Sequence, residues 1–517
     1  MKRNYLKGVR IALAILFFVP ITLFFIDSWH KLPPQVHVLL HLQLVPALLA
    51  GMWITVIALL LLTLLLGRIY CSVICPAGIL QDIFIRFSRR GKKKNKKKRW
   101  FMYRPAYNIF RYVLLSAVIL SFLFGATGLL LMLDPYSNFG RIVSNLLRPL
   151  VIWGNNALAD GLMAMDNYSL YHITIQYVTG ASIIAAVVAL VVFAGMSILR
   201  GRLFCNTLCP VGGLLSLISR YSFFRISFDK EACNNCGNCE RTCKAECINS
   251  REKTVDTSRC ITCFNCISAC KKGGLQYRFL PDLRHKEVKQ EEACETNSSR
   301  RSFITTGATL LGTLSFIPGW ARRNRKRKRS QCPDGPITPP GSISQERFTE
   351  KCTACHLCVI KCPNQILKPA GLEFGFNYLL KPHVVYEKAY CNYECTVCSE
   401  VCPNLALKDL LPEEKVTTQI GVAHFEKDLC VVYNDETDCG ACSEHCPTQA
   451  VKMVPYKGML RIPEVNPDIC IGCGGCEYIC PVRPDRAIHI VANAIHKKVQ
   501  KPEYEQVEEK KIDDFGF

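Results

Sequence analysis

The sequence lacks the motifs of enzymes that transform a substrate by themselves. Its 517 residues contain no nucleotide fingerprint, no flavin motif and no catalytic triad. No long apolar run has a histidine in its interior. The four histidines of the N-terminal half lie outside the runs or at an edge; they are His30, His37, His41 and His172. No haem site is apparent, since a membrane b-type haem usually needs histidines within the spans. These absences leave one-electron transfer through a bound cofactor, with no bond-making site of the chain's own.

Acidic residues are also few, with 42 Asp and Glu against 64 Lys and Arg. This excess does not indicate a nucleic-acid partner, because a cubane held by four thiolates carries about −2, and six would offset about 12 charges. The 31 cysteines are an odd number, which does not suit a closed disulfide framework. They occur in tight groups of four, which indicates metal or cluster ligation.

Four apolar runs approach or reach the length that spans a bilayer, about 20 residues. Lys and Arg crowd the first ten residues, the stretch after the second run and residues 200–225, whereas the two intervening loops carry one and two. The positive-inside rule then puts both ends of this half in the cytoplasm. The basic run 89–99 is predicted to be a topological anchor, with a lipid-headgroup or partner patch as the alternative. The runs are 9–26, 43–66, 111–133 and 173–199.

Two stretches 134 residues apart repeat one pattern. GRIYCSVICPAGIL begins at residue 67 and GRLFCNTLCPVGGL at residue 201. The repeat predicts two related helical hairpins, and a helical CxxxC puts both of its sulfurs on one face. The four thiols are candidates for one metal site or a redox pair, and buried cysteines in helix packing are the alternative. They are Cys71, Cys75, Cys205 and Cys209. The outer histidines could serve a quinone pocket.

Residues 233–270 write the pattern CxxCxxCxxxC twice. In two-cluster ferredoxin units, three cysteines of one motif bind a [4Fe–4S] cluster and the fourth ligand comes from the other motif. Lysine follows Cys243 and Cys270, where proline is usual. The predicted ligand sets are Cys233, Cys236, Cys239 and Cys270 for one cluster, and Cys260, Cys263, Cys266 and Cys243 for the other.

The C-terminal region repeats this arrangement twice, which raises the expected total to six [4Fe–4S] clusters. Short apolar runs such as 487–492 predict the small strands that flank such loops. Cys247, Cys294 and Cys332 are left over as bystander thiols. The further ligand sets are Cys352, Cys355, Cys358 and Cys402; Cys391, Cys395, Cys398 and Cys362; Cys430, Cys439, Cys442 and Cys480; and Cys470, Cys473, Cys476 and Cys446.

The expected fold class is an α-helical membrane domain of four spans in two pseudo-repeated hairpins, with α+β ferredoxin-like bicluster domains. Ser299-Arg300-Arg301-Ser302-Phe303 resembles a twin-arginine export signal, although the basic run 322–329 opposes export by the positive-inside rule. The expected organisation is a membrane domain at 1–225, a two-cluster unit at 226–280, a twin-arginine-like segment or fifth span at 299–321, a linker at 322–344, two-cluster units at 345–410 and 418–492, and a charged tail at 493–517.

Residues 1–280, with four spans, two CxxxCP motifs and a two-cluster unit, resemble the NapH-type membrane ferredoxins. Residues 299–490 resemble the NapG/MauM-type ferredoxins. The resemblance implies a membrane-bound polyferredoxin of the bacterial inner membrane that draws electrons from the quinol pool and passes them to a periplasmic reductase or cytochrome. It implies an electron-transfer component of an oxidoreductase system rather than a stand-alone enzyme. The 226–280 unit is then cytoplasmic and the C-terminal clusters periplasmic.

Two other functions are compatible with the motifs. The CxxxCP thiols also resemble those of NosR-type and oxidase-assembly ferredoxins, so a metal-handling or respiratory-complex assembly factor is the alternative. A redox sensor is a third hypothesis, but the chain has no recognisable output domain.

Overall fold

The computed structural model describes residues 5–27, 37–90, 101–175, 179–229, 231–279 and 335–501. Several sequence predictions lie outside these residues. They are the twin-arginine-like segment 299–321, most of the basic run 89–99, the basic stretch 322–329, His30, Cys294, Cys332 and most of the charged tail.

The four apolar runs are helical, but two of them are broken. Among the described helices, only α1 (Tyr5–Ile26) and α11 (Gly180–Arg200) are long and apolar enough to cross a membrane by length and composition. The second run forms α3 (Leu44–Ala50) and α4 (Trp53–Leu66), and Gly51 between them takes the left-handed φ of 78° that favours glycine. The third forms α7 (Asn108–Leu123) and α8 (Gly128–Leu133).

The long helices carry their apolar side chains outward. Only 28% of the apolar window of α1 and 22% of that of α11 is buried. Leu16 on α1 and Ile184 on α11 are more than half exposed, as are Ile54 on α4 and Leu123 on α7. The core helix of a soluble domain would bury such a face. The described part of this chain does not cover these apolar surfaces, so they are available for contact with an apolar environment.

Both CxxxC repeats fold in the same way, which agrees with the expected pseudo-repeat. Each apolar helix ends at a glycine, a short helix carries the first cysteine, and a proline opens the next helix directly after the second cysteine. Proline suits the first helical position because its missing N–H has no partner to lose there. The elements are α5 (Tyr70–Val73) and α6 (Pro76–Arg90) in the first repeat, and α12 (Leu203–Thr207) and α13 (Pro210–Ser219) in the second.

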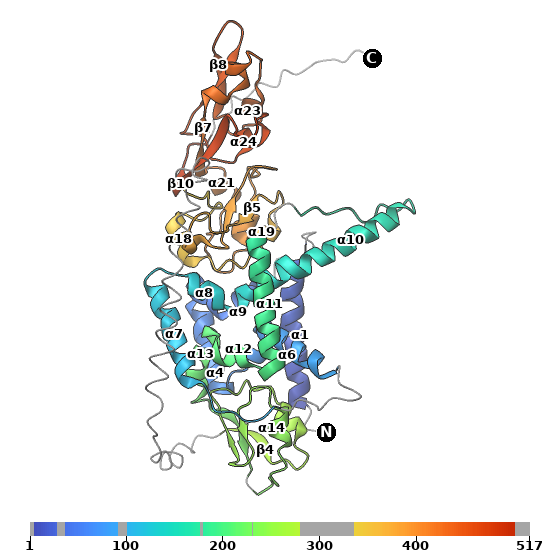
Figure 1. The fold of residues 1–517 in the computed structure, drawn as a ribbon. Coiled ribbons are helices and arrows are strands. Elements are labelled where there is room, and N and C mark those ends of the chain that lie inside the picture. The colour runs from blue at the N-terminus through green and yellow to red at the C-terminus, as the bar shows by residue number, and fades with distance from the viewer. Residues whose placement is uncertain are drawn as a thin grey trace, which may run out of the picture.

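The connection between the third and fourth apolar runs, residues 134–172, is largely helical. Its residues form α9 (Pro135–Ile142), the π-helix η2 (Val143–Leu147) and α10 (Arg148–Met163), which projects away from the bundle (Figure 1). Asp134 caps α9, since its carboxylate accepts the backbone N–H of Ser137 at 2.9 Å. The short helix α2 (Val38–His41) precedes α3.

Three ferredoxin-like units follow the expected α+β pattern. In the part of the chain that the structure describes, every sheet has two antiparallel strands. Unit A has β1 (Phe224–Phe228), α14 (Asn238–Thr242), β2 (Ile248–Asn249), β3 (Thr254–Val255), α15 (Asn265–Ala269) and β4 (Leu275–Phe279). Unit B has α18 (Gln345–Lys351), α19 (Leu357–Lys361), β5 (Leu367–Pro369), η5 (Phe376–Tyr378), β6 (Pro382–Val384) and α20 (Val397–Glu400). Unit C has α21 (Pro412–Lys415), β7 (Thr418–Phe425), η6 (Lys427–Leu429), α22 (Val431–Asn434), α23 (Ala441–Glu444), β8 (Val451–Pro455), β9 (Arg461–Val465), α24 (Gly475–Ile479) and β10 (Ile488–Lys498).

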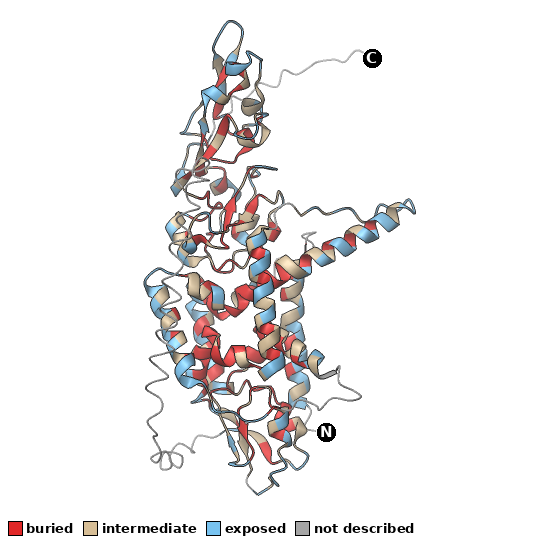
Figure 2. Cartoon of the chain, in the orientation of Figure 1, coloured by how far each residue is buried: buried red, intermediate tan, exposed pale blue. Residues whose placement is uncertain are grey.

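Unit A lies at one end of the helical domain, and units B and C lie at the other (Figure 1). At the first end, the backbone N–H of Arg202 donates to the carbonyl of Lys244 at 2.9 Å. At the second, Lys361 of unit B forms a buried ion pair of 2.8 Å with Asp27, at the end of α1. Buried residues concentrate in the middle of the helical domain (Figure 2), in one core that also includes residues of both units A and B.

Candidate iron–sulfur and thiol sites

The two CxxxC repeats interlock through their arginines. Arg202 donates from Nη1 to the carbonyl of Cys71 at 3.0 Å, and Arg68 donates from Nη2 to the carbonyl of Cys205 at 3.1 Å. Both arginines are fully buried. Each repeat therefore supplies the cation that holds the cysteine-bearing turn of the other, which explains why arginine occurs in both copies.

The glycine that follows each Cys-Pro pair allows this close approach. A Cβ on Gly78 would lie 2.2 Å from the carbonyl oxygen of Cys71, and one on Gly212 would lie 1.9 Å from that of Cys205. Both distances are far below van der Waals contact with backbone that cannot easily move. Glycine is thus required at both positions by the packing of one turn on the next.

We expect Gly212→Ala to destabilise the protein by about 1–3 kcal/mol or more, because the new methyl group would overpack the turn. The adjacent Gly213 is a matched control, since a Cβ there would meet its nearest atom, on Leu115, at an ordinary 3.6 Å. The thermal midpoint of the purified protein in detergent should fall for Gly212→Ala and hold for Gly213→Ala. Equal midpoints would contradict this account of the turn.

The structure brings the four thiols Cys71, Cys75, Cys205 and Cys209 together, and we call them the thiol quartet. All are buried, and each lies within electrostatic range of others in the set. Arg68 Nη2 lies 3.9 Å from Cys71 Sγ and Gln81 Nε2 lies 3.4 Å from Cys205 Sγ. These polar groups suit a negatively charged thiolate centre better than a purely apolar packing role.

The spacing of the thiols bears on what they could hold. Among the described residues, no three cysteine sulfurs come within 4.8 Å of one another. A single tetrahedral zinc ion with Zn–S bonds of 2.3 Å would bring neighbouring sulfurs to about 3.8 Å. A polynuclear iron–sulfur centre spreads its thiolates farther apart. None of the described cysteine sets is therefore drawn together as tightly as a single tetrahedral zinc ion would require.

In unit A the motifs cross as expected. Cys239 of the first motif lies within electrostatic range of Cys233 and of Cys270, the last cysteine of the second motif. Cys266 lies within range of Cys260 and Cys263 of its own motif and of Cys243 from the first. We call these sets group A1 (Cys233, Cys236, Cys239, Cys270) and group A2 (Cys243, Cys260, Cys263, Cys266). Cys236 is exposed on the loop of group A1.

Cys247 is not simply a distant bystander. Its Sγ lies 3.5 Å from that of Cys243, and it interacts with Cys260 as well. Sequence reasoning missed this position, because the interval from Cys243 to Cys247 fits no part of the CxxCxxCxxxC pattern. The side chain is 2% exposed, so this thiol is shielded from solvent beside group A2.

Lys244, which replaces the usual proline after Cys243, docks unit A onto the helical domain. Its Nζ lies 3.1 Å from Asp82 Oδ2, and Arg10 and Arg202 also pair with this carboxylate at 3.1 and 2.8 Å. Burial opposes the charge of Asp82, but these three cations outweigh it and hold its pKa well below the usual range. Proline at position 244 could not make this ion pair.

Units B and C bring together four further sets, again crossed. Cys402 lies near Cys352, Cys355 and Cys358, while Cys362 lies near Cys391, Cys395 and Cys398. Likewise, Cys480 joins the 430–442 motif and Cys446 joins the 470–476 motif. We call these sets B1 (Cys352, Cys355, Cys358, Cys402), B2 (Cys362, Cys391, Cys395, Cys398), C1 (Cys446, Cys470, Cys473, Cys476) and C2 (Cys430, Cys439, Cys442, Cys480).

Neighbouring groups follow one another in a fixed order. Cys358 of B1 lies within range of Cys398 of B2, and Cys473 of C1 lies within range of Cys391 of B2. The backbone N–H of Cys391 also donates to the carbonyl of Cys473 at 2.9 Å. Cys476 of C1 reaches Cys442 of C2. The order from the helical domain outward is therefore B1, B2, C1 and C2.

These thiols suit metal ligation rather than free thiol chemistry. Burial raises the pKa of Cys352 to about 11 and that of Cys442 to about 12. Such thiols are not ionised at neutral pH on their own, but a bound metal supplies the positive charge that deprotonates a coordinating thiol. A bound metal would therefore convert these two thiols to thiolates.

Group B1 lies directly against the helical domain. The Tyr136 hydroxyl and the Nε and Nη1 of Arg141 are buried, and in the described part of the chain they have no hydrogen-bond partner. Both residues lie within electrostatic range of Cys355. Unsatisfied buried donors beside a set of thiols are what an anionic cluster in that place would satisfy.

His356, between ligand positions of B1, fixes this contact. Its Nε2 hydrogen-bonds the carbonyl of Leu380 at 3.0 Å and its Nδ1 lies 3.2 Å from the side-chain amide of Asn145, on the π-helix η2. Burial lowers the pKa of His356 to about 3, so the ring is neutral. The two hydrogen bonds of His356 join the π-helix η2 of the helical domain to the loop of B1.

Two of the predicted outer histidines also lie beside B1. The rings of His37 and His41 pack edge to face with centroids 4.6 Å apart. They hydrogen-bond the backbone at Val401 and Pro403, the residues on either side of Cys402. His172 instead pairs with Asp160 at 2.9 Å on the surface.

Comparison with known families identifies iron–sulfur domains in both halves. A family described as "4Fe-4S binding domain" matches residues 48–95 and 182–231, the two segments that carry the thiol quartet. A family described as "4Fe-4S dicluster domain" matches residues 437–483, in unit C. No solved structure matches the chain.

Curated relatives are ferredoxin-type proteins. The methylamine utilization ferredoxin-type protein MauM of Methylorubrum extorquens is 31% identical over 192 residues, 35% of this chain and 84% of the relative. The ferredoxin-type protein NapG of Escherichia coli K12 is 30% identical over 198 residues, 36% of this chain and 84% of the relative. The ferredoxin-type protein NapF of the same organism is 27% identical over 157 residues, 30% of this chain and 87% of the relative. The chain therefore belongs to the Nap/Mau family of ferredoxin-type iron–sulfur electron-transfer proteins.

Proposed function

We propose that this protein is a membrane-bound polyferredoxin that carries electrons from the quinol pool, through [4Fe–4S] clusters, to a periplasmic reductase or cytochrome. The order of thiol groups is the observation that supports it most. Groups A2 and B1 lie against opposite ends of the helical domain, and B2, C1 and C2 continue outward from B1. Such a series suits conduction over distance rather than a single catalytic centre.

In this proposal each of the six crossed groups holds one [4Fe–4S] cluster. The bound clusters supply one-electron redox chemistry, and the chain positions them and offsets their charge. Arg141 and Lys381 stand beside B1, and Lys244 stands beside A2. These cations favour the reduced, more negative form of the neighbouring centre.

The thiol quartet is proposed as a redox centre inside the helical domain. Tyr70 lies within range of Cys71 and Cys75 on one side and of Asp134 on the other. Tyr136 lies within range of Asp134 and of Cys355 and Cys402 in B1. Tyr70, Asp134 and Tyr136 are thus successive neighbours within electrostatic range between the quartet and B1, which supports a route through the domain.

A membrane location is supported by the outward-facing apolar surfaces of α1, α4, α7 and α11. Arginines also gather at the unit A end, including Arg10, Arg68, Arg111, Arg200 and Arg202, while Arg141 and Arg148 are on the B1 side. By the positive-inside rule, this asymmetry favours a cytoplasmic unit A and periplasmic units B and C. We also propose that the four apolar runs, two of which are broken helices, span the membrane with a NapH-like topology.

A metal-handling or assembly role for the quartet is less well supported. Its four side chains are only 3–4% exposed. The interlocked arginines and the glycine contacts would have to separate before a metal ion could leave. A delivery factor needs a ligand set that a recipient can reach, which this packing does not offer.

The sidedness is testable with a cysteine-free reporter fused after Phe517. We expect the reporter to be exposed in the periplasm, because units B and C lie at the end of the helical domain opposite unit A. The Arg300→Lys, Arg301→Lys pair tests the twin-arginine-like segment.

The reporter signal should be lost from the periplasm in the double variant, with protein still made. A matched Arg322→Lys, Arg323→Lys variant keeps the signal if the effect is specific to the RR pair. A cytoplasmic reporter on the unchanged chain would refute the transmembrane route.

A further inference from the structure

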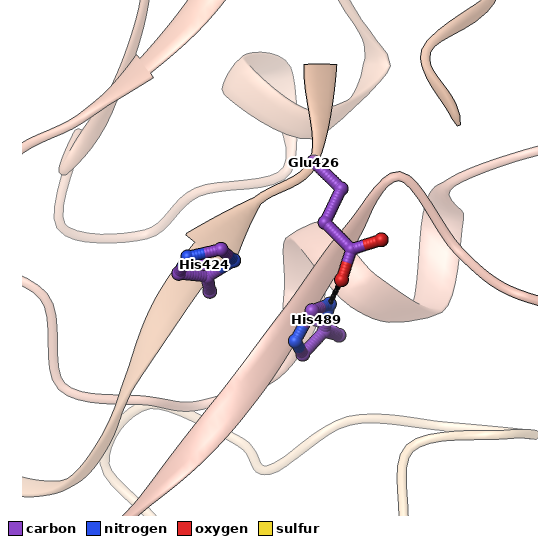
Figure 3. A group of neighbouring side chains, drawn as sticks. All are labelled: His424, Glu426 and His489. Carbon is purple, nitrogen blue, oxygen red and sulfur yellow. Dashed lines mark ion pairs between the residues drawn. The ribbon is translucent and has the colours of Figure 1, made fainter. Parts of the chain in front are cut away.

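Three metal-ligating side chains meet on the outer face of the sheet in unit C, away from every cysteine group. His424 on β7 and His489 on β10 stand directly opposite each other in the antiparallel register. Glu426 follows His424 by two residues, which returns its side chain to the same face. Figure 3 shows the Glu426 carboxylate reaching toward His489, with the His424 ring beside them.

The geometry suits one metal ion. The candidate ligand atoms of all three residues lie within 4.8 Å of one another, and Nδ1 of His489 is 3.8 Å from Oε1 of Glu426. Bonds of about 2.0–2.2 Å would bring ligand atoms to about 3.3–3.6 Å apart in a tetrahedral site. The side chains are free to make this small adjustment, since Glu426 is 47% exposed and His489 is 26% exposed.

The backbone beneath them is already fixed. Phe425 pairs with Ile488 in the register, and the N–H of Glu426 donates to the carbonyl of Ala487 at 2.7 Å. Phe425 and Ile488 point to the inner face, where they line a pocket with the cysteines of group C2. The three ligands therefore stand on one side of a two-stranded sheet and group C2 lies under the other.

Ordinary hydrogen bonding does not account for the cluster. In the part of the chain that the structure describes, the only ion pair of either ring is the one between His489 and Glu426, and neither ring makes a hydrogen bond to another residue. The two rings pack with centroids 5.4 Å apart. The neutral form of an imidazole ring is the one that binds metals, and both rings have a nitrogen on the face that Glu426 shares.

We propose that His424, Glu426 and His489 bind one divalent transition-metal ion of the zinc class at the surface of unit C. Two imidazole ligands select zinc and its transition-metal neighbours over Mg²⁺ and Ca²⁺, which prefer oxygen ligands throughout. Three protein ligands leave a coordination position open to water or to a side chain of a docking protein. The site rests on the sheet geometry alone and holds whether or not the proposed electron route is correct.

The test uses the full-length, cluster-loaded protein after a chelator wash. Zinc is titrated into this protein, and calorimetry measures its binding. The unchanged protein should bind one Zn²⁺ that His424→Ala and His489→Ala each weaken at least tenfold, with the iron content unchanged. His172→Ala is the matched control, because His172 is an exposed histidine paired with a carboxylate but has no third ligand.

X-ray absorption at the zinc edge separates this site from stray binding to cysteine. Nitrogen and oxygen ligands without sulfur are expected for the unchanged protein. Equal zinc binding in all the variants would show that His489 and Glu426 form only a surface ion pair and that zinc binds elsewhere. A zinc–sulfur shell would show that the zinc is bound by cysteine thiols. Either result would overturn the proposal.

Discussion

Anaerobically isolated protein is expected to contain about 24 irons and about 24 acid-labile sulfides per chain from groups A1 to C2, four of each per cubane. The structure brings together members of each crossed set from separate motifs, as a cluster held by two paired loops requires. Iron and sulfide analysis with quantitative EPR of the reduced protein measures this directly.

Cys247→Ser provides the control for this count. Cys247 touches Cys243 of group A2 but completes no predicted ligand set. The variant should keep the full iron content, and a loss of about four irons would make Cys247 a ligand of A2. Preparations that hold mainly zinc, or that saturate near eight irons, would contradict the six-cluster proposal.

The cysteine groups could be predicted from the sequence because ligand spacing is a local property. Three thiols on one tight loop reach three corners of a cubane, and the crossing of the fourth follows from pairing two such loops. The structure brings Cys270 to Cys239 and Cys402 to Cys352 on this rule. Repetition of the CxxxCP stretch likewise predicted that its two copies meet.

Other features of the site could not be predicted, because they depend on contacts between segments that are far apart in the sequence. The arginine of one repeat holds the other, and Lys244 takes the place of proline because Asp82 lies across the interface. The helices within the connection 134–172 were not predicted, because the span pattern says nothing of the structure between two spans. Two apolar runs are interrupted at glycines whose conformation no hydropathy pattern indicates.

The pairing of helical breaks with thiol groups has a physical reason. A helix that runs straight through the domain satisfies all its backbone hydrogen bonds and leaves no room for a buried centre. Where the repeats break at the cysteines, the carbonyls of Cys71 and Cys205 become free to accept from buried arginines. The broken segments thus bring cations and thiols to one place inside the helical domain.

Replacing Cys71, Cys75, Cys205 and Cys209 together by serine is expected to abolish most quinol-driven reduction of groups B1 to C2. The quartet is the only thiol set inside the helical domain among the residues that the structure describes, and Tyr70, Asp134 and Tyr136 connect it with B1. Without it, electrons would have to cross from the far side of the domain in one step. Absorbance of the clusters after addition of a quinol, followed by stopped flow, measures the rate.

The same variant should keep the six-cluster spectrum, because no member of the quartet belongs to groups A1 to C2. Reduction by dithionite, which reaches exposed clusters directly, should therefore be unchanged, and this separates a lost route from a lost fold. Cys247→Ser is the matched control for removal of a buried cysteine and should reduce at the normal rate. If quinol-driven reduction survives in the quadruple variant, the quartet has only a packing role. The interlocked arginines would then hold the two turns together with no redox centre between them.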